Sequence, residues 1–254
     1  MMKKLKAILR ILIALSIVAV VVIAIIKMQS RACEKIEVKF HYNGEFLPLD
    51  ETGVTTMLEV AEIPIIGEEL KNIPLHQVSN VLKTNPFVKE IEKMYFTGTS
   101  LVISILLKTP LLHIFPLTGE QYFMDEDGML LPYSPNIKEN LMVANGQITE
   151  QYNSSYRLNE GKRILRSLYL IAKTIHADPF YNAQFRQMYV NDNLEIELIP
   201  TVGNHIVLFG NEERISDKLF ILQKTYTDAL AYTGMDQYKQ LDVRFRNRVI
   251  AQKR

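Results

Sequence analysis

Residues 7–26 read AILRILIALSIVAVVVIAII, and this stretch decides how the rest of the chain is placed. Every residue from 11 to 26 is apolar except Ser16, and Arg10 carries the only charge in the stretch. A helix of about 20 residues is about 30 Å long, which matches the hydrocarbon core of a bilayer. The stretch therefore predicts a single N-terminal transmembrane helix that attaches the body of the protein to a membrane.

The charges on either side of this helix predict its orientation. Residues 1–10 form a short tail with four basic residues and no acid, whereas acids partly offset the bases beyond residue 31. An excess of Lys and Arg marks the cytoplasmic side. We therefore expect a cytoplasmic tail, an anchor with a short linker at residues 11–31, and a translocated body. A cleaved signal peptide or a lipoprotein acylated at Cys33 stays an alternative, although the residues before Cys33 fit both processing signals poorly.

The composition of the body, residues 32–254, excludes several classes of protein. It holds 23 basic and 28 acidic residues, a net charge of −5, whereas nucleic-acid-binding proteins carry a basic footprint. We therefore expect no nucleic-acid partner. Cys33 is the only cysteine of the 254-residue chain, which excludes an intrachain disulfide and a CxxC redox site. A body of this length suffices for one large domain or two small ones.

The hydrophobic pattern of residues 32–115 predicts a small domain with β-α-α-β-β order. Residues 36–41 alternate between apolar and polar side chains, which is typical of a half-buried strand. Residues 101–107 are nearly all apolar and therefore suit the central strand of a sheet. The predicted elements are strands at 36–41, 87–96 and 101–107 and helices at 54–61 and 72–85.

Residues 116–254 predict a β-rich domain with an antiparallel sheet and flanking helices, so the whole body belongs to the α+β class. Three acids and Gly128 at 125–128 suit a tight hairpin turn, while a calcium loop would need a distal acidic ligand that the sequence lacks. Helices with one apolar face are predicted at 161–177 and 215–230, the second capped by Gly234. The predicted strands are 121–124, 129–131, 185–190, 194–199, 206–209 and 241–250.

No pattern of side chains in the chain predicts an enzyme. The sequence contains no GxSxG elbow, P-loop, GxGxxG loop or HExxH helix. Its five histidines are scattered, and no two stand at the spacing of metal ligands on a helix. We therefore expect no catalytic residue, no cofactor, no metal and no small-molecule substrate, unless an active site is dispersed along the chain.

The order of these features resembles the bacterial cell-division family FtsQ, called DivIB in Gram-positive bacteria, and in particular its Bacteroidetes-type members. Five stretches carry the resemblance. Residues 82–89 are similar to an L-x-x-x-P-x-V segment, and residues 107–110 to an E-R-x-P element whose acid is replaced by Leu107. The others are residues 122–128, similar to Y-x-x-D-x-x-G, residues 198–210, similar to L-I-P…G…I-x-L-G, and residues 242–245, similar to D-L-R-Y.

The resemblance implies a non-enzymatic scaffold of the divisome that supports septum formation. Members of the family have a short cytoplasmic tail, one helix in the inner membrane, a POTRA domain and a β-rich domain outside that membrane. They bind the bitopic division proteins FtsB and FtsL, and FtsB adds a strand to the last strand of the β-rich domain. For this chain the resemblance implies residues 7–26 in the inner membrane, a periplasmic body and a location at the division septum.

The C-terminal sequence permits such strand addition independently. Over residues 241–250 apolar and charged side chains alternate, and residues 244–254 hold five bases and no acid. A strand at the chain end is expected at a sheet edge, where it can accept an acidic partner strand. The alternative is that these charges only protect the edge from aggregation. The predicted partner-binding residues are Val243, Arg244, Phe245, Arg246, Arg248 and Val249.

Three other kinds of protein compete with this interpretation, and the first of them does not fit the chain. A POTRA protein of outer-membrane assembly would need a barrel of about 16 strands of ~10 residues, for which the chain is too short. A membrane-anchored envelope enzyme would need a pocket whose carboxylates have shifted pKa values. An assembly factor unrelated to division would differ from a divisome scaffold only in its partners.

Overall fold

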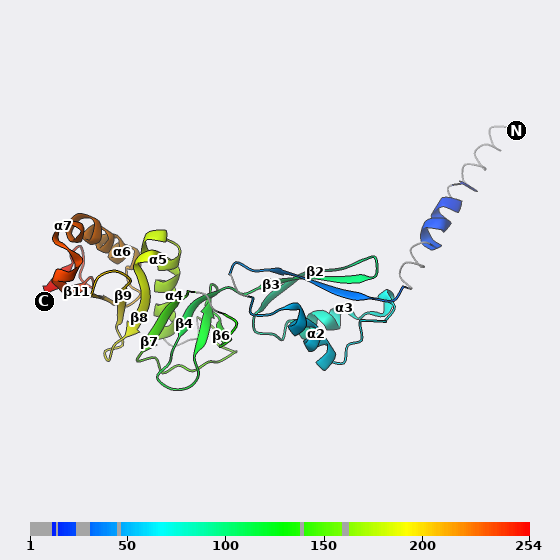
Figure 1. The fold of residues 1–254 in the computed structure, drawn as a ribbon, viewed down its shortest axis with the longest axis horizontal. Coiled ribbons are helices and arrows are strands. Elements are labelled where there is room, and N and C mark those ends of the chain that lie inside the picture. The colour runs from blue at the N-terminus through cyan, green and yellow to red at the C-terminus, as the bar shows by residue number, and fades with distance from the viewer. Residues whose placement is uncertain (1–11, 14, 24–30, 45–46, 138–139, 159–162) are drawn as a thin grey trace. The chain divides into compact units, whose positions relative to one another are not determined.

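The computed structural model describes residues 12–13, 15–23, 31–44, 47–137, 140–158 and 163–254 (Figure 1). The chain divides into two compact units, one of Met1–Tyr42 with Leu49–Leu107 and one of Asn43–Pro48 with Lys108–Arg254. The main part of the second unit thus begins at Lys108, earlier than the predicted start at residue 116. The strand β4 (Pro110–Ile114), which the sequence did not predict, lies in its sheet.

The first unit has the predicted β-α-α-β-β order, and its central strand is the predicted one. The sheet order is β1-β3-β2, with β3 parallel to β1 and antiparallel to β2. The central position of β3 explains why its side chains are almost all apolar. The elements are β1 (Lys35–His41), α2 (Glu51–Val60), a 3-10 turn (Leu70–Asn72), α3 (Leu75–Leu82), β2 (Val88–Thr97) and β3 (Ser100–Leu107).

Both helices of this unit bury one apolar face against the same core as the sheet. The side chain of Asp50 caps α2, because its Oδ1 accepts a hydrogen bond of 2.7 Å from the Gly53 N–H. Val54 and Leu58 of α2 are buried together with Val78 and Leu82 of α3. The start of α2 and the buried faces of both helices therefore follow from local sequence signals, and this half of the α+β prediction is confirmed.

The second unit is built on a nine-stranded sheet in the order β12-β11-β10-β9-β8-β7-β4-β5-β6. The predicted antiparallel sheet is wrong in detail, because β4–β7, β7–β8 and β10–β11 are parallel pairs. The crossovers between these strands leave room for helices. The strands not yet given are β5 (Tyr122–Asp125), β6 (Leu130–Pro132), β7 (Met142–Gly146), β8 (Phe185–Val190), β9 (Ile196–Pro200), β10 (Ile206–Gly210), β11 (Tyr238–Asp242) and β12 (Ile250–Lys253).

The main helices of the second unit share a hydrophobic core with the sheet. The longest, α4 (Arg163–His176), buries Leu168, Ile171 and Ile175 among side chains of the strands, as its apolar periodicity predicts. The predicted helix at 215–230 is α6 (Ile215–Lys224) continued by a π-helical segment, Thr225–Leu230. Shorter helical pieces are α5 (Pro179–Gln184), α7 (Ala231–Thr233), which Gly234 caps as predicted, and a 3-10 turn (Met235–Gln237).

The hairpin between β5 and β6 confirms the predicted turn at 125–128. The Asp125 Oδ1 accepts hydrogen bonds from the N–H groups of Asp127, at 3.0 Å, and Met129, at 2.8 Å. Burial raises the pKa of Asp125 above its usual value, although these backbone bonds oppose the shift. A carboxylate held by its own turn is structural, and no group of three or more His, Cys, Asp and Glu in the described residues could hold a metal ion.

The predicted last strand at 241–250 is wrong. In the structure β11 ends at Asp242 and β12 begins at Ile250, with residues 243–249 between them as a turn. The Asp242 side chain accepts a hydrogen bond of 3.0 Å from the Arg244 N–H, and Asn247 has a left-handed backbone with φ 56°. These two features reverse the chain, although the side chains alternate as they would in a strand.

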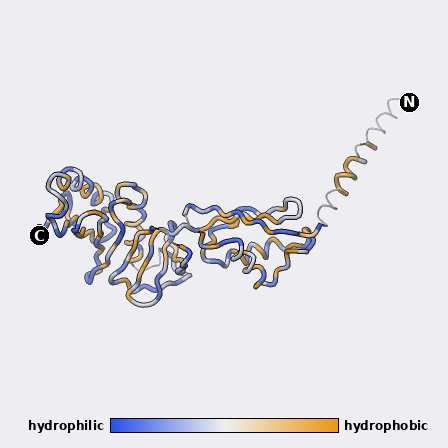
Figure 2. The backbone as a smooth tube through the Cα atoms, in the orientation of Figure 1, coloured by the Kyte–Doolittle hydropathy of each residue, from blue (hydrophilic) through white to orange (hydrophobic). Residues whose placement is uncertain are grey.

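The predicted anchor falls only partly within the described residues. Residues 12–13 and 15–23 are helical and strongly hydrophobic (Figure 2), whereas residues 1–11, 14 and 24–30 are not among those described. Within the described part of the chain, no helix has both the length and the apolar character needed to cross a bilayer.

Candidate functional site

The strand β12 lies at one end of the sheet order, with β11 as its neighbour. Its four residues are all exposed, and among the described residues no strand pairs with its other side. The Arg254 N–H points toward the β11 side, where it donates a hydrogen bond of 3.1 Å to the Gln237 carbonyl oxygen. Because backbone groups alternate along an antiparallel strand, the N–H groups of Ala251 and Lys253 are then expected to face the open side. β12 therefore offers a short ladder of free backbone groups.

The six predicted partner-binding residues lie in the connection between the last two strands, residues 243–249, which we name the β11–β12 turn. The structure brings Phe245, Arg246 and Arg248 together at the surface, while Val243 is 0% exposed and belongs to the core. Phe245 is 40% exposed, so the predicted apolar face shared by Val243 and Phe245 does not exist. Val249 is partly buried against the core.

Arg244 joins three parts of the second unit instead of facing outward. Its Nη1 lies 2.6 Å from the Glu195 Oε2, and its Nη2 lies 2.6 Å from the Asp242 Oδ2. Burial alone would raise the pKa of Asp242, but the hydrogen bonds from Arg244 lower it below its usual value. The same bonds raise the pKa of Arg244. Arg214 completes the arrangement by donating to the Arg244 carbonyl oxygen at 2.8 Å. Arg244 therefore fixes the start of the β11–β12 turn.

An apolar groove lies between α6 and the β11–β12 turn. Its volume is about 270 Å³, and its walls include Phe220, Ile221 and Phe245. Phe220 is 58% exposed, and a cation covers each aromatic ring: the Lys224 Nζ lies 5.1 Å from the Phe220 ring centroid and the Arg248 Cζ 5.1 Å from that of Phe245. The periodicity of residues 215–230 placed Phe220 outside the buried face, but gave no sign that it faces a groove.

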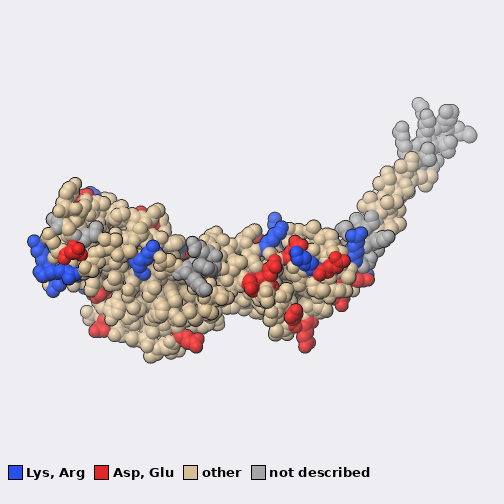
Figure 3. Space-filling view, in the orientation of Figure 1, with Lys and Arg blue, Asp and Glu red and all other residues tan. Residues whose placement is uncertain are grey.

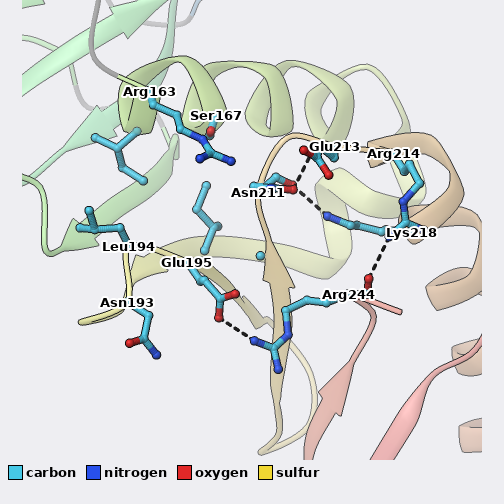
Figure 4. Close-up of a pocket in the computed structure, with 13 residues that line it drawn as sticks. Arg163, Ser167, Asn193, Leu194, Glu195, Asn211, Glu213, Arg214, Lys218 and Arg244 are labelled. Carbon is cyan, nitrogen blue, oxygen red and sulfur yellow. Dashed lines mark hydrogen bonds and ion pairs between the residues drawn. The ribbon is translucent and has the colours of Figure 1, made fainter. Parts of the chain in front are cut away.

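A larger cavity of about 470 Å³ adjoins this groove, and we name it the Lys218 cavity (Figure 4). Side chains from the start of α4, the segment before β9, the end of β10 and the start of α6 line it. Lys218 is only 3% exposed, and its ammonium donates a hydrogen bond of 2.9 Å to the Asn211 carbonyl oxygen. Burial, assisted by the positive charge of Arg214, lowers the pKa of Lys218 to about 8.

No signal in the sequence separates Lys218 from a surface lysine. It precedes Leu219 of the buried face of α6, and a lysine at such a boundary normally extends into water. Here Phe209 of β10 lies under the ammonium, with its ring centroid 4.8 Å from the Lys218 Nζ. The cavity also depends on Gly210, where a Cβ atom would stand 3.1 Å from the Arg244 Cγ. The contact between Gly210 and Arg244 joins residues 34 positions apart along the chain.

Basic side chains gather at the C-terminal end of the second unit (Figure 3). Arg246, Arg248, Lys253 and Arg254 are all exposed there, in β12 or within four residues of it along the chain. The Arg254 Nη2 also donates to the Asn204 carbonyl oxygen at 2.7 Å, which holds the chain end against the sheet. Exposed bases beside a free strand suit an acidic extended segment.

Two family models match the chain. One, described as "FtsQ/DivIB, C-terminal related", matches residues 109–252, which is more than half of the chain. The other, a POTRA-like domain, matches residues 31–106 and so covers the first unit up to β3. None of the curated proteins compared with the chain matches it.

Proposed function

The chain belongs to the FtsQ/DivIB C-terminal-related family, and we propose from this premise that it is a non-enzymatic scaffold of the bacterial divisome. The POTRA-like match ahead of the β-rich unit supports the same domain order as in that family. We place residues 7–26 in the inner membrane, the N-terminus in the cytoplasm and the body in the periplasm, at the division septum. The charge bias of the tail and the apolar run support this topology.

The partners in this proposal are FtsB/FtsL-like bitopic division proteins, bound by strand addition to β12. The observation that carries the proposal is the exposed β12 edge, whose outward backbone groups have no partner among the described residues. Backbone hydrogen bonds would supply affinity, and side-chain contacts beside the strand would supply specificity. The exposed bases around β12 would draw an acidic segment to the edge.

Within the β11–β12 turn the six predicted residues take two different roles in the proposal. Phe245, Arg246 and Arg248 are exposed and contact the partner, with Val249 at the margin. Val243 and Arg244 act as positioning residues, because one is buried in the core and the other holds Asp242 and Glu195. Substitution of either positioning residue should weaken partner binding by displacing the turn.

Depletion of the protein in its native bacterium, followed by microscopy, tests the proposed role. Loss of a divisome scaffold should give long filaments without septa that still segregate their chromosomes. Cells of normal length with a leaking envelope would contradict the proposal and favour an assembly factor or an envelope enzyme. A version that carries a disrupted β12 edge should fail to restore septation, whereas the unmodified chain should restore it.

A further inference from the structure

We propose that the Lys218 cavity is a binding site for a small anion, the carboxylate or phosphate group of a ligand. Its volume of about 470 Å³ falls within the range of ~300–1,000 Å³ typical of small-molecule sites. The site is separate from the backbone edge of β12, and the proposal does not depend on strand addition.

The charges of the cavity wall leave an excess of positive charge. Arg244 and Glu195 are both among the lining residues and form a 2.6 Å ion pair, and Arg244 is paired with Asp242 as well. The lining charges that remain are three cations, Arg163, Arg214 and Lys218, and one acid, Glu213. A cavity with this balance attracts an anion, and its recessed shape strengthens the attraction because water screens it less.

Lys218 supplies the specific reason for a ligand. An ammonium has three N–H donors, and one of them goes to the Asn211 carbonyl oxygen. Among the described residues no acid lies within ion-pair distance of it, and the face of Phe209 lies beside the ammonium. Glu213, Glu212 and Glu195 attract it only from farther away. A buried charge that lacks a counter-ion is costly. An anion in the cavity would provide both the missing charge and the missing hydrogen-bond acceptors.

The guanidinium groups lie around the same space. In Figure 4 the side chain of Arg163 extends from the start of α4 toward the cavity, and Lys218 reaches in from α6. Arg214 uses one amino group on the Arg244 carbonyl oxygen and keeps further donors. Planar guanidinium groups bind carboxylate and phosphate oxygens with two parallel hydrogen bonds, so this set of side chains suits an oxyanion.

The test is a titration of the full-length protein in detergent micelles with inorganic phosphate, followed by calorimetry and by NMR shifts of residues around the cavity. Lys218→Met keeps the unbranched shape and most of the length of the side chain and removes the charge, and we expect it to weaken phosphate binding at least tenfold. Arg163→Ala, at an exposed position that cannot disturb the core, should weaken it severalfold. Lys224→Met, on the same helix but outside the cavity, should leave the affinity unchanged.

Equal phosphate affinity in the unmodified protein and in both cavity variants would overturn the proposal, as would equal losses in the Lys224→Met control. The source of the anion is identified by adding phosphate during a titration with a division partner. Competition would point to an acidic side chain of the partner, and an unchanged partner affinity to a free anion; either result supports an anion site. Failure of strand addition at β12 would leave the phosphate result intact, so the two proposals are separable.

Discussion

Two turns of the second unit use the same chemistry with different surroundings. After β5 the Asp125 carboxylate accepts the N–H of Asp127, and after β11 the Asp242 carboxylate accepts the N–H of Arg244. Asp125 is buried in a tight hairpin and held by backbone N–H groups alone. Asp242 is bound by the guanidinium of Arg244, which also reaches Glu195.

The difference explains why one turn is structural and the other can present a binding surface. The hairpin after Asp125 closes on itself and leads directly into β6. The β11–β12 turn is fixed by charged contacts at its start and by the partly buried Val249 at its end. Between these points it displays Phe245, Arg246 and Arg248 to solvent. A turn held at one end by charge can carry exposed side chains without depending on them for its shape.

The largest expected effect on folding is that of Asp242→Ala. The substitution removes the carboxylate that accepts three hydrogen bonds from Arg244, one from its backbone N–H and two from its guanidinium. We expect it to lower the free energy of unfolding by about 2–3 kcal/mol. Asp125→Ala removes two hydrogen bonds donated by uncharged backbone N–H groups. It should lower the free energy of unfolding by about 1–2 kcal/mol. Urea unfolding of both variants measures the difference. An equal or larger loss in Asp125→Ala would show that charge adds nothing to the second turn.

Phe245→Glu separates binding from stability. Phe245 is exposed, so the substitution should change the free energy of unfolding by less than about 0.5 kcal/mol. It should weaken the binding of an FtsB-like periplasmic segment by a factor of about 30 or more, because it removes an aromatic contact and repels an acidic partner. The matched control is Leu117→Glu, at an apolar residue that is 53% exposed outside the turn. Unchanged affinity of the Phe245→Glu variant would remove Phe245 from the site.

The two aspartates should respond to pH with opposite signs. The pKa of Asp242 is lowered in the folded state, so its contribution to stability is full above a pH of about 4 and is lost as the pH falls through the folded pKa. The pKa of Asp125 is raised, so the folded state binds its proton first and gains stability from this group as the pH falls toward 4. Asp242→Asn should therefore flatten the acid limb of the stability curve, and Asp125→Asn should steepen it. Curves that change in the same direction would contradict this assignment.

The smallest effect expected is that of Glu195→Gln. The ion pair between Glu195 and Arg244 is about one-third exposed, so water screens it, and its loss should cost about 0.5 kcal/mol. The β11–β12 turn should keep its conformation, because Asp242 still holds Arg244. Thermal unfolding and the NMR spectrum of the turn test this. A loss comparable with that of Asp242→Ala would mean that the bridge to β9, and not the local turn, fixes the segment.

The comparison of the two turns also shows what the sequence could predict. Apolar periodicity predicted α4 and the central strand β3, because one buried face dominates each element. It failed beyond Asp242, where side chains alternate as in a strand while an aspartate and a left-handed Asn247 turn the chain. The acids followed by Gly128 predicted the turn at residues 125–128. At residues 242–244 an aspartate also begins a turn, but Val and Arg follow it and carry no turn signal.

The site was only partly predictable for a similar reason. Position at the chain end predicted an edge strand at residues 241–250, whereas the strand at the edge of the sheet is β12, Ile250–Lys253. The Lys218 cavity depends on contacts among α4, β10 and α6, and no spacing along the chain encodes them. A buried lysine and a surface lysine have the same sequence signature, so only the three-dimensional arrangement distinguishes them.

The central claim is strand addition at β12, and Ala251→Pro tests it most directly. Its N–H is expected to face the open side, so proline removes a donor to the partner without removing one to β11. In a calorimetric titration of the full-length protein with an FtsB-like periplasmic segment, Ala251→Pro should weaken binding at least tenfold, while Ala251→Ser binds normally. An affinity equal to that of the unmodified protein, with β11 and β12 still paired by NMR, would contradict strand addition. The exposed bases would then serve only to protect the strand edge from aggregation.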